Sequence, residues 1–120
     1  MQVTIGTVLV GMDDNPLKDK IPSGQKNLMG GDIMIDGPEI TLRSVSMTAL
    51  TGVYEDERNL SGDEKVKRWM LAVKLKRAGD SVDLVSEEIV LIKKLIGKAY
   101  GPIVCGQAWQ LLEADAALNS

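Results

Sequence analysis

The sequence contains no histidine and no phenylalanine, and it has a single cysteine. The absence of histidine removes the most common general base and metal ligand, together with every nucleophilic arrangement that depends on histidine. A lone cysteine, Cys105, cannot form an intramolecular disulfide, which favours a reducing compartment such as the cytoplasm. We therefore expect a protein that is not an enzyme and that binds no metal and no cofactor.

Aromatic residues and strong charge are also scarce. Two Trp and two Tyr are the only aromatic residues, so the core must be aliphatic and stacked bases would find few platforms. The net charge is only −3 and there is no basic tail, which makes nucleic acid an unlikely partner. No apolar run approaches the ~20 residues of a membrane span, and the first residues lack a signal-peptide pattern. These absences predict a cytoplasmic protein without membrane contact.

What is present is the composition of an ordinary folded domain. Hydrophobic residues make up 44% of the 120 residues and charged residues 26%, far from the composition of disordered chains. A chain of this length is enough for one hydrophobic core. We expect one domain over 1–120.

The N-terminal part, residues 1–37, reads as β-structure. Residues 2–10 alternate apolar and polar positions with many β-branched side chains, which predicts a strand. Residues 11–31 are rich in turn formers and predict a long loop. A short second strand over 33–35 is expected to pair antiparallel with the first. Such a two-stranded ribbon is marginal alone and needs helices packed on one face.

The remaining residues, 38–114, predict a helical core, with a tail over 115–120. Thr41 is placed to cap a helix over 42–53, and Ser61 with Glu64 has capping-box spacing before a helix over 62–78. Ser86 is expected to cap a third helix, and Pro102 suits the first turn of a fourth over 103–114. The expected fold class is α+β, mainly α, with an N-terminal two-stranded β-ribbon packed on a four-helix core.

The apolar faces of these helices predict their packing. In the second helix, Val66, Trp69, Met70 and Val73 lie opposite Leu71, Leu75 and Ala78, which predicts a helix sandwiched between others. Basic side chains lie at scattered angles around this helix and are expected to solvate its edges. They are Lys65, Lys67, Arg68, Lys74, Lys76 and Arg77. In the fourth helix, Cys105 falls on the apolar side, which predicts a buried and inert thiol.

Three motifs that resemble functional sites have simpler explanations. Residues 13–15, Asp-Asp-Asn, lack the spacing of a calcium loop and read as turn formers. Gly30-Gly31 lacks the surroundings of a phosphate-binding loop and indicates a hairpin or hinge. Glu87 and Glu88 point about 100° apart on a helix, where they complement the positive end of its dipole.

Three strings together resemble small uncharacterised accessory proteins of tailed phages and prophages. They are Leu60-Ser-Gly-Asp-Glu-Lys-Val-Lys-Arg-Trp69, Glu87-Glu-Ile-Val-Leu-Ile-Lys-Lys94 and residues 102–113 with Gly106-Gln-Ala-Trp109 and Leu111-Leu-Glu113. The resemblance covers roughly residues 38–113. It implies a protein that acts in a bacterial cytoplasm or during virion assembly, and it transfers no catalytic residue.

The leading hypothesis is a non-catalytic phage-type accessory protein that binds a protein partner, a host factor or a viral protein. Adaptable Met-rich segments and partly exposed aromatic rings suit such contacts. The candidate partner-binding residues are Met12, Leu28, Met29, Tyr54 and Trp109. One alternative is a virion or tail-assembly component or chaperone that forms homo-oligomers through its N-terminal strand. A second alternative is nucleic-acid binding through the basic helix 62–78.

Overall fold

The computed structural model describes residues 1–118, with side chains described as far as Glu113. Four helices form the core, and a short two-stranded ribbon packs on it, which confirms the expected α+β, mainly α class. In chain order the elements are β1 Gln2–Thr4, β2 Lys18–Lys26, β3 Asp32–Glu39, α1 Leu42–Thr51, a 3₁₀ turn Glu55–Glu57, α2 Gly62–Arg77, β4 Ser81–Asp83, α3 Ser86–Ala99 and α4 Pro102–Leu118.

The N-terminal strand has a different partner from the one predicted. β1 pairs antiparallel with β4, with Val3 opposite Val82, so its expected pairing with residues 33–35 is wrong. The strand is also shorter than 2–10, because beyond Thr4 the chain turns to bond the start of α1, where Arg43 N donates to the Ile5 carbonyl at 2.8 Å. Val3 and Ile5, which the alternation predicts on one face of the strand, are both buried in the core. Alternation identifies the buried face of a strand but carries no information about the neighbouring strand.

Residues 11–31 are not a long loop, because residues 18–31 belong to a β-hairpin. β2 and β3 pair antiparallel with Ile21 opposite Ile35, and the register shifts between Pro22 and Lys26. Within that irregularity Gly24 takes φ +88°, which glycine adopts without steric cost. Both faces of this hairpin are open to solvent, so Pro22 and polar residues are tolerated and the usual apolar strand pattern is missing. We call residues 18–39 the arm.

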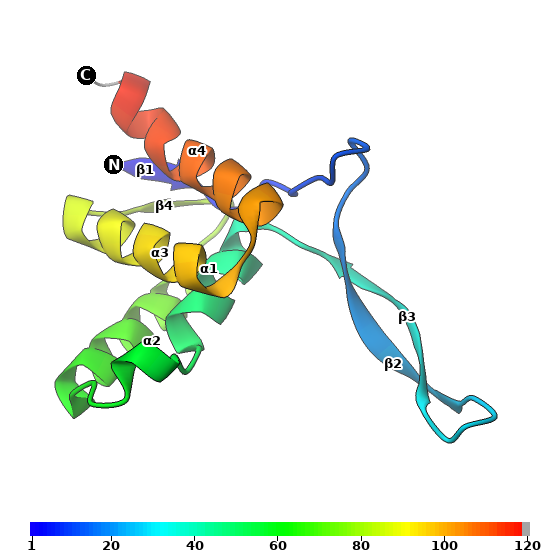
Figure 1. Cartoon of the computed structure of the whole chain (residues 1–120). Helices are drawn as coiled ribbons and strands as arrows, with labels where there is room; N and C mark the ends of the chain where they lie inside the picture. Colours follow the sequence, from blue (N-terminus) through cyan, green and yellow to red (C-terminus); the bar gives the residue numbers. More distant parts are fainter. Residues whose placement is uncertain (119–120) are drawn as a thin grey trace.

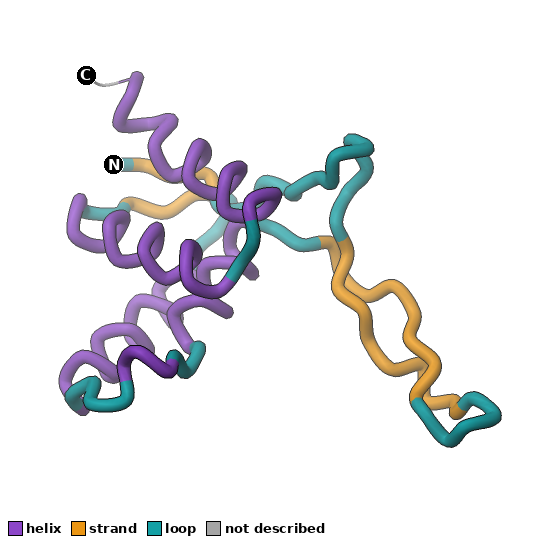
Figure 2. The backbone as a smooth tube through the Cα atoms, viewed as in Figure 1, coloured by secondary structure: helices purple, strands orange, loops and turns teal. Residues whose placement is uncertain are grey.

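The arm projects away from the helical body (Figure 1), and the same view by secondary structure shows loops joining it to the core (Figure 2). The radius of gyration is therefore 16.0 Å, above the about 13.6 Å expected for a compact chain of this length. Backbone hydrogen bonds fix its base, where Leu17 N donates to Leu9 O at 2.9 Å and Ile40 N donates to Leu17 O at 2.8 Å. The arm is anchored at one end and free along its length.

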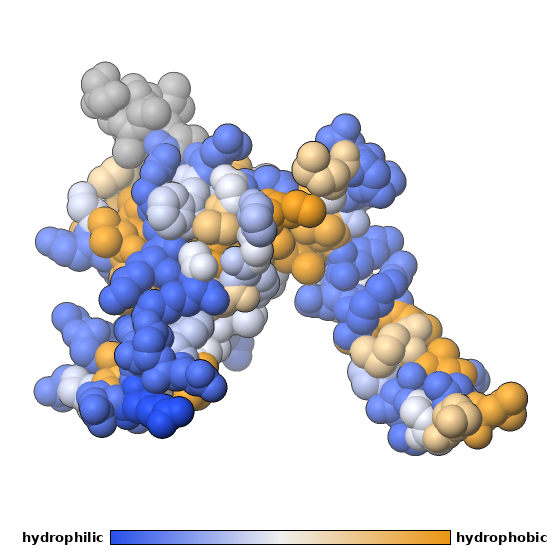
Figure 3. Space-filling model, in the orientation of Figure 1, coloured by the Kyte–Doolittle hydropathy of each residue, from blue (hydrophilic) through white to orange (hydrophobic). Residues whose placement is uncertain are grey.

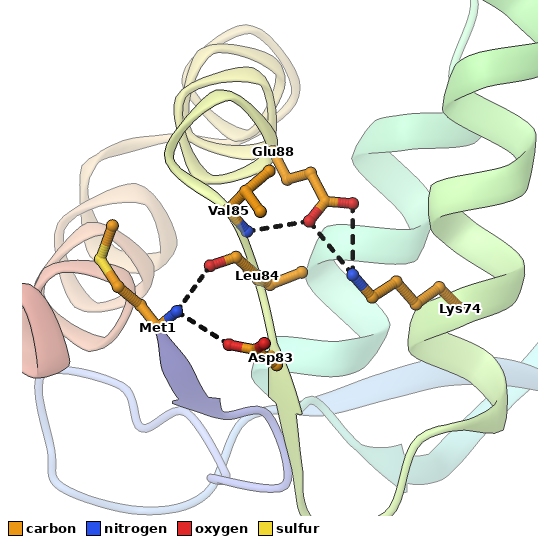
Figure 4. A network of polar contacts seen from close by, with 6 residues as sticks. All are labelled: Met1, Lys74, Asp83, Leu84, Val85 and Glu88. Atoms are coloured by element: carbon orange, nitrogen blue, oxygen red, sulfur yellow. Dashed lines mark hydrogen bonds and ion pairs between the residues drawn. The ribbon is translucent and has the colours of Figure 1, made fainter.

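Local capping sets the helix starts. Thr41 caps α1 as predicted, accepting from Ser44 N at 3.2 Å, and Ser61 accepts from Glu64 N at 3.2 Å at the start of α2. The cap of α3 is Val85 and not Ser86, because Val85 is still extended while Ser86 is already helical. A carboxylate oxygen of Glu88 accepts the Val85 N–H at 2.9 Å instead (Figure 4).

The segment from β4 to the start of α3 also contacts the N-terminus and α2. The Met1 amino group donates to the Asp83 carboxylate at 2.8 Å and to the Leu84 carbonyl at 2.9 Å, while Lys74 of α2 donates to Glu88 of α3 at 3.1 Å (Figure 4). The bonds of Met1 thereby hold the chain against β4 one residue before β1 begins.

The C-terminal helix is longer than predicted. α4 continues to Leu118, so the expected helix end at 114 and the expected tail are wrong for residues 115–118. The rest of the predicted tail, residues 119–120, lies outside the described residues. No helix among the described residues combines the length and the apolar content that crossing a membrane requires.

The sandwich predicted for α2 is wrong, because this helix lies at the edge of the body and buries only one face. Leu71, Ala72 and Leu75 are buried there, whereas Trp69 and Met70 are 61% and 60% exposed. α2 packs on α1, and within the described part of the chain no other helix or strand packs extensively against it. The helix period identified two apolar faces, and only one of them has a neighbour.

Ser46 supplies a first stability prediction. It is buried in α1, and within the described part of the chain its hydroxyl has no hydrogen-bond partner. Ser46→Ala removes this unsatisfied group, so we expect the free energy of unfolding to stay unchanged or rise by up to about 1 kcal/mol in urea titrations. Ser44→Ala is the matched control, since the Ser44 hydroxyl accepts from Thr41 N at 2.9 Å and its loss should cost about 1 kcal/mol. Equal losses in both variants would contradict the prediction.

Candidate functional site

The outer face of α2 carries an uncovered apolar stripe. Val66, Met70 and Val73 are four and three residues apart, so they lie in line along the helix, with Trp69 beside them. Val66 is 54% exposed, and Val73 is half-buried. We call these four residues the outer stripe. Exposed basic side chains flank it, namely Lys65, Lys67, Lys74, Lys76 and Arg77.

Beside the stripe lies a groove of about 520 Å³ between the end of α1, the connector that follows it and the first half of α2. Its apolar lining includes Leu50, Val53, Leu60 and Trp69, and Val53 is fully exposed. We call it the α1–α2 groove. Trp69 belongs to both the groove and the outer stripe, so the two form one continuous surface.

Tyr54 forms one wall of the groove and is fixed there. Its hydroxyl donates to the Ala49 carbonyl at 2.6 Å, and the Lys98 ammonium lies 5.6 Å from the ring centroid. Burial raises the pKa of Tyr54, so the phenol is a weaker acid than a solvent-exposed tyrosine. A Cβ on Gly52 would lie 3.0 Å from the Tyr54 hydroxyl oxygen, so a side chain there would force the Tyr54 ring to shift by a few tenths of an ångström. This predicted binding residue therefore shapes the groove.

A buried ion pair holds the groove's connector against α2. The Arg68 guanidinium donates to both carboxylate oxygens of Glu57 at 2.8 and 2.6 Å, and Lys98 lies 3.4 Å from the same carboxylate. The hydrogen bonds from Arg68 lower the pKa of Glu57 to about 2. Arg68 is 5% exposed, so its prediction as a solvated helix edge is wrong. Nothing in the sequence indicates that Glu57 and Arg68 form an ion pair, because they are eleven residues apart and lie on different elements.

The arm ends in a turn built by Asn27. Its side-chain oxygen accepts from Met29 N at 2.9 Å and from Gly31 N at 3.0 Å, and Gly30 takes φ +82°. Leu28 and Met29 are consequently held in the open, at 106% and 93% exposure. Figure 3 shows hydrophobic atoms gathered on the outer part of the arm. We call Leu28 and Met29 the arm tip.

Trp109 lies at the α3–α4 edge. Its indole N–H donates to the Lys93 carbonyl at 3.0 Å, the Lys93 ammonium sits 4.6 Å from the ring centroid, and the side chain remains 38% exposed. The neighbouring Cys105, predicted to be buried, packs against the core but is only half-buried.

Met12 lies at the bend between the core and the arm and is 86% exposed. Asp13 beside it accepts from Asn15 N at 3.1 Å, which confirms a turn at the predicted turn formers. The five candidate residues thus occupy four places: the bend, the arm tip, the groove and the α3–α4 edge. Sequence reasoning missed the outer stripe, since it assigned that face to the core.

The described residues contain no group of three or more acidic or cysteine side chains placed to hold a metal ion. The surfaces that stand out are the α1–α2 groove with the outer stripe, and the arm tip. Comparison of the chain with protein-family models, with curated proteins and with solved structures finds no match.

Proposed function

We propose that this protein is a non-catalytic accessory protein that binds another protein through the α1–α2 groove and the outer stripe. The observation that carries the proposal is the exposure of Trp69 and Met70 on a helix whose opposite face is anchored in the core. Contiguous apolar surface with tryptophan and methionine is the chemistry of protein interfaces. The buried Glu57–Arg68 pair and the Tyr54 hydrogen bond hold this surface in one shape, which reduces the entropy lost on binding.

The apolar stripe favours a protein over a nucleic acid. A phosphate backbone would engage the basic side chains and leave Val66, Trp69 and Met70 uncovered. Arg68, one of the six basic residues of α2, is already occupied by Glu57. A partner with apolar and acidic side chains would satisfy both the stripe and the lysines beside it.

The resemblance to tailed-phage accessory proteins supports the setting that we propose, a bacterial cytoplasm during phage growth. There the partner would be a host factor or a viral protein. Action as an assembly component or chaperone remains the alternative within this proposal.

The test is affinity purification from bacterial lysate with three forms of the protein. Trp69→Ser is expected to lower recovery of a stoichiometric partner at least tenfold, because interface tryptophans contribute strongly to affinity. The matched control is Val90→Ser on α3, which is 64% exposed and outside the surface. Circular dichroism establishes that all three forms are folded. Equal recovery of every protein with Trp69→Ser and the wild type would contradict the proposal.

A further inference from the structure

A projecting two-stranded arm gains little stability from its own contacts, so its presence needs another explanation. A lone two-stranded ribbon is marginal in water, and the arm keeps an apolar face of Ile21, Ile33 and Ile35 that remains 39% to 46% exposed. At its end, four hydrogen bonds around Asn27 form a turn that presents Leu28 and Met29. A turn ordered in this way loses little entropy on binding, and its exposed Leu28 and Met29 side chains are suited to an apolar site.

The same chain carries a site of matching chemistry. The α1–α2 groove, about 520 Å³, falls within the range of roughly 300–1,000 Å³ of sites that enclose small apolar ligands. Leucine and methionine side chains would meet Leu50, Val53, Leu60 and Trp69 there. The apolar tip and the apolar groove are therefore complementary in character.

The charges of the two elements are complementary as well. The arm carries three lysines against four acidic residues, Asp19, Asp32, Asp36 and Glu39, for a net charge of −1. α2 carries six basic residues against Asp63 and Glu64, for a net charge of +4. All these basic residues except Arg68 are exposed. Within the arm, Asp36 and Asp32 are already paired with Lys20 and Lys26, so the attraction between an arm and α2 comes from the single surplus negative charge of the arm.

One copy cannot make this contact with itself. In Figure 1 the arm and α2 extend to opposite sides of the molecule. The base of the arm is fixed by the hydrogen bonds that join Leu9, Leu17 and Ile40, so the arm cannot fold back without breaking them. The complementary surfaces must belong to two different molecules.

We infer that the arm tip of one copy binds in the α1–α2 groove of a second copy. This inference rests on the proposed binding role of the groove and names its occupant. Because tip and groove are different parts of the chain, the contact is heterologous and repeats from copy to copy, which builds rings or filaments.

The test uses sedimentation velocity on the purified full chain across a concentration series. The wild type is expected to form oligomers larger than a dimer. A tip variant, Leu28→Asp with Met29→Asp, and a groove variant, Val53→Asp, are each expected to stay monomeric. Both sites are fully exposed, so the changes leave the core intact. Met12→Asp, also exposed and outside both surfaces, should assemble like the wild type.

Mixing the two variants gives the decisive result. The intact arm tip of the groove variant should enter the intact groove of the tip variant, and the damaged surfaces should stop further growth, so an equimolar mixture should contain 1:1 dimers only. A wild type that stays monomeric throughout, or a mixture that stays monomeric, would overturn the inference. Assembly that survives Val53→Asp would also overturn it. If a different protein is then recovered in a Trp69-dependent way, the proposed function stands and only the self-assembly fails.

Discussion

Replacing Glu57 by glutamine is expected to lower the free energy of unfolding by about 3 kcal/mol, because the 5% exposed Arg68 would keep its charge without a carboxylate partner. Lys98 would be affected less, since it also lies 3.0 Å from Asp56. Urea unfolding followed by circular dichroism measures the loss. Glu55→Gln, on the same 3₁₀ turn but exposed, is the matched control and should change the free energy by less than about 0.5 kcal/mol.

A double variant measures the interaction between Glu57 and Arg68 apart from the effect of each residue alone. Arg68→Met together with Glu57→Gln leaves no uncompensated guanidinium, so it should be more stable than Glu57→Gln alone. If the two losses simply add, Arg68 and Glu57 do not stabilise the connector as a pair.

The pH dependence of the same pair has a defined direction. The folded pKa of Glu57 is lowered to about 2 from an ordinary value of 4.5, so its contribution to stability is complete above about pH 4.5 and is lost as the pH falls toward 2. The difference in stability between the wild type and Glu57→Gln should therefore shrink over this interval. A difference that stays constant down to pH 2 would show that the pKa of Glu57 is the same in the folded and unfolded states, so that Arg68 does not lower it.

Replacing Leu75 by alanine is expected to cost about 3 kcal/mol, whereas replacing Met70 by alanine should cost less than about 1 kcal/mol. Leu75 is fully buried on the inner face of α2, and its truncation leaves a cavity that the surrounding core fills only in part. Met70 is on the same helix but 60% exposed, so little packing is lost. Thermal and urea unfolding of both variants measure the contrast.

The two α2 substitutions also test which face of the helix is anchored. The sandwich expected from the apolar pattern would make Met70→Ala nearly as costly as Leu75→Ala. Comparable losses would mean that the outer stripe is covered in the isolated protein, which would remove the basis of the proposed binding surface.

The helical part was largely readable from local sequence. Thr41 and Ser61 cap their helices as expected, and α1 and α2 end within two residues of the predicted positions. The start of α3 was misplaced by one residue, because Glu88 supplies the hydrogen bond that was assigned to Ser86. These features depend on hydrogen bonds between residues three to five apart, which neighbouring side chains determine.

Most of the arm and of the candidate site could not be predicted from the sequence. Pro22, Ser23 and Gly24 are typical turn formers, but here they lie inside β2, because a ribbon open on both faces needs no apolar alternation. Tyr54 was expected to bind a partner and lines the groove, while Trp69 was assigned to the core and is exposed. Exposure depends on whether another element covers a face, and periodicity contains no information about that.

The sequence by itself determined the mainly helical class, the helix caps, the aliphatic core and the lack of any histidine chemistry. Only the tertiary structure decided that β1 pairs with β4, that residues 18–39 form a projecting arm and that Arg68 is buried against Glu57. The physical reason is the range of the interactions. Capping and helix periodicity act within one or two turns, whereas strand partners, buried ion pairs and uncovered faces arise between segments that meet only when the chain folds.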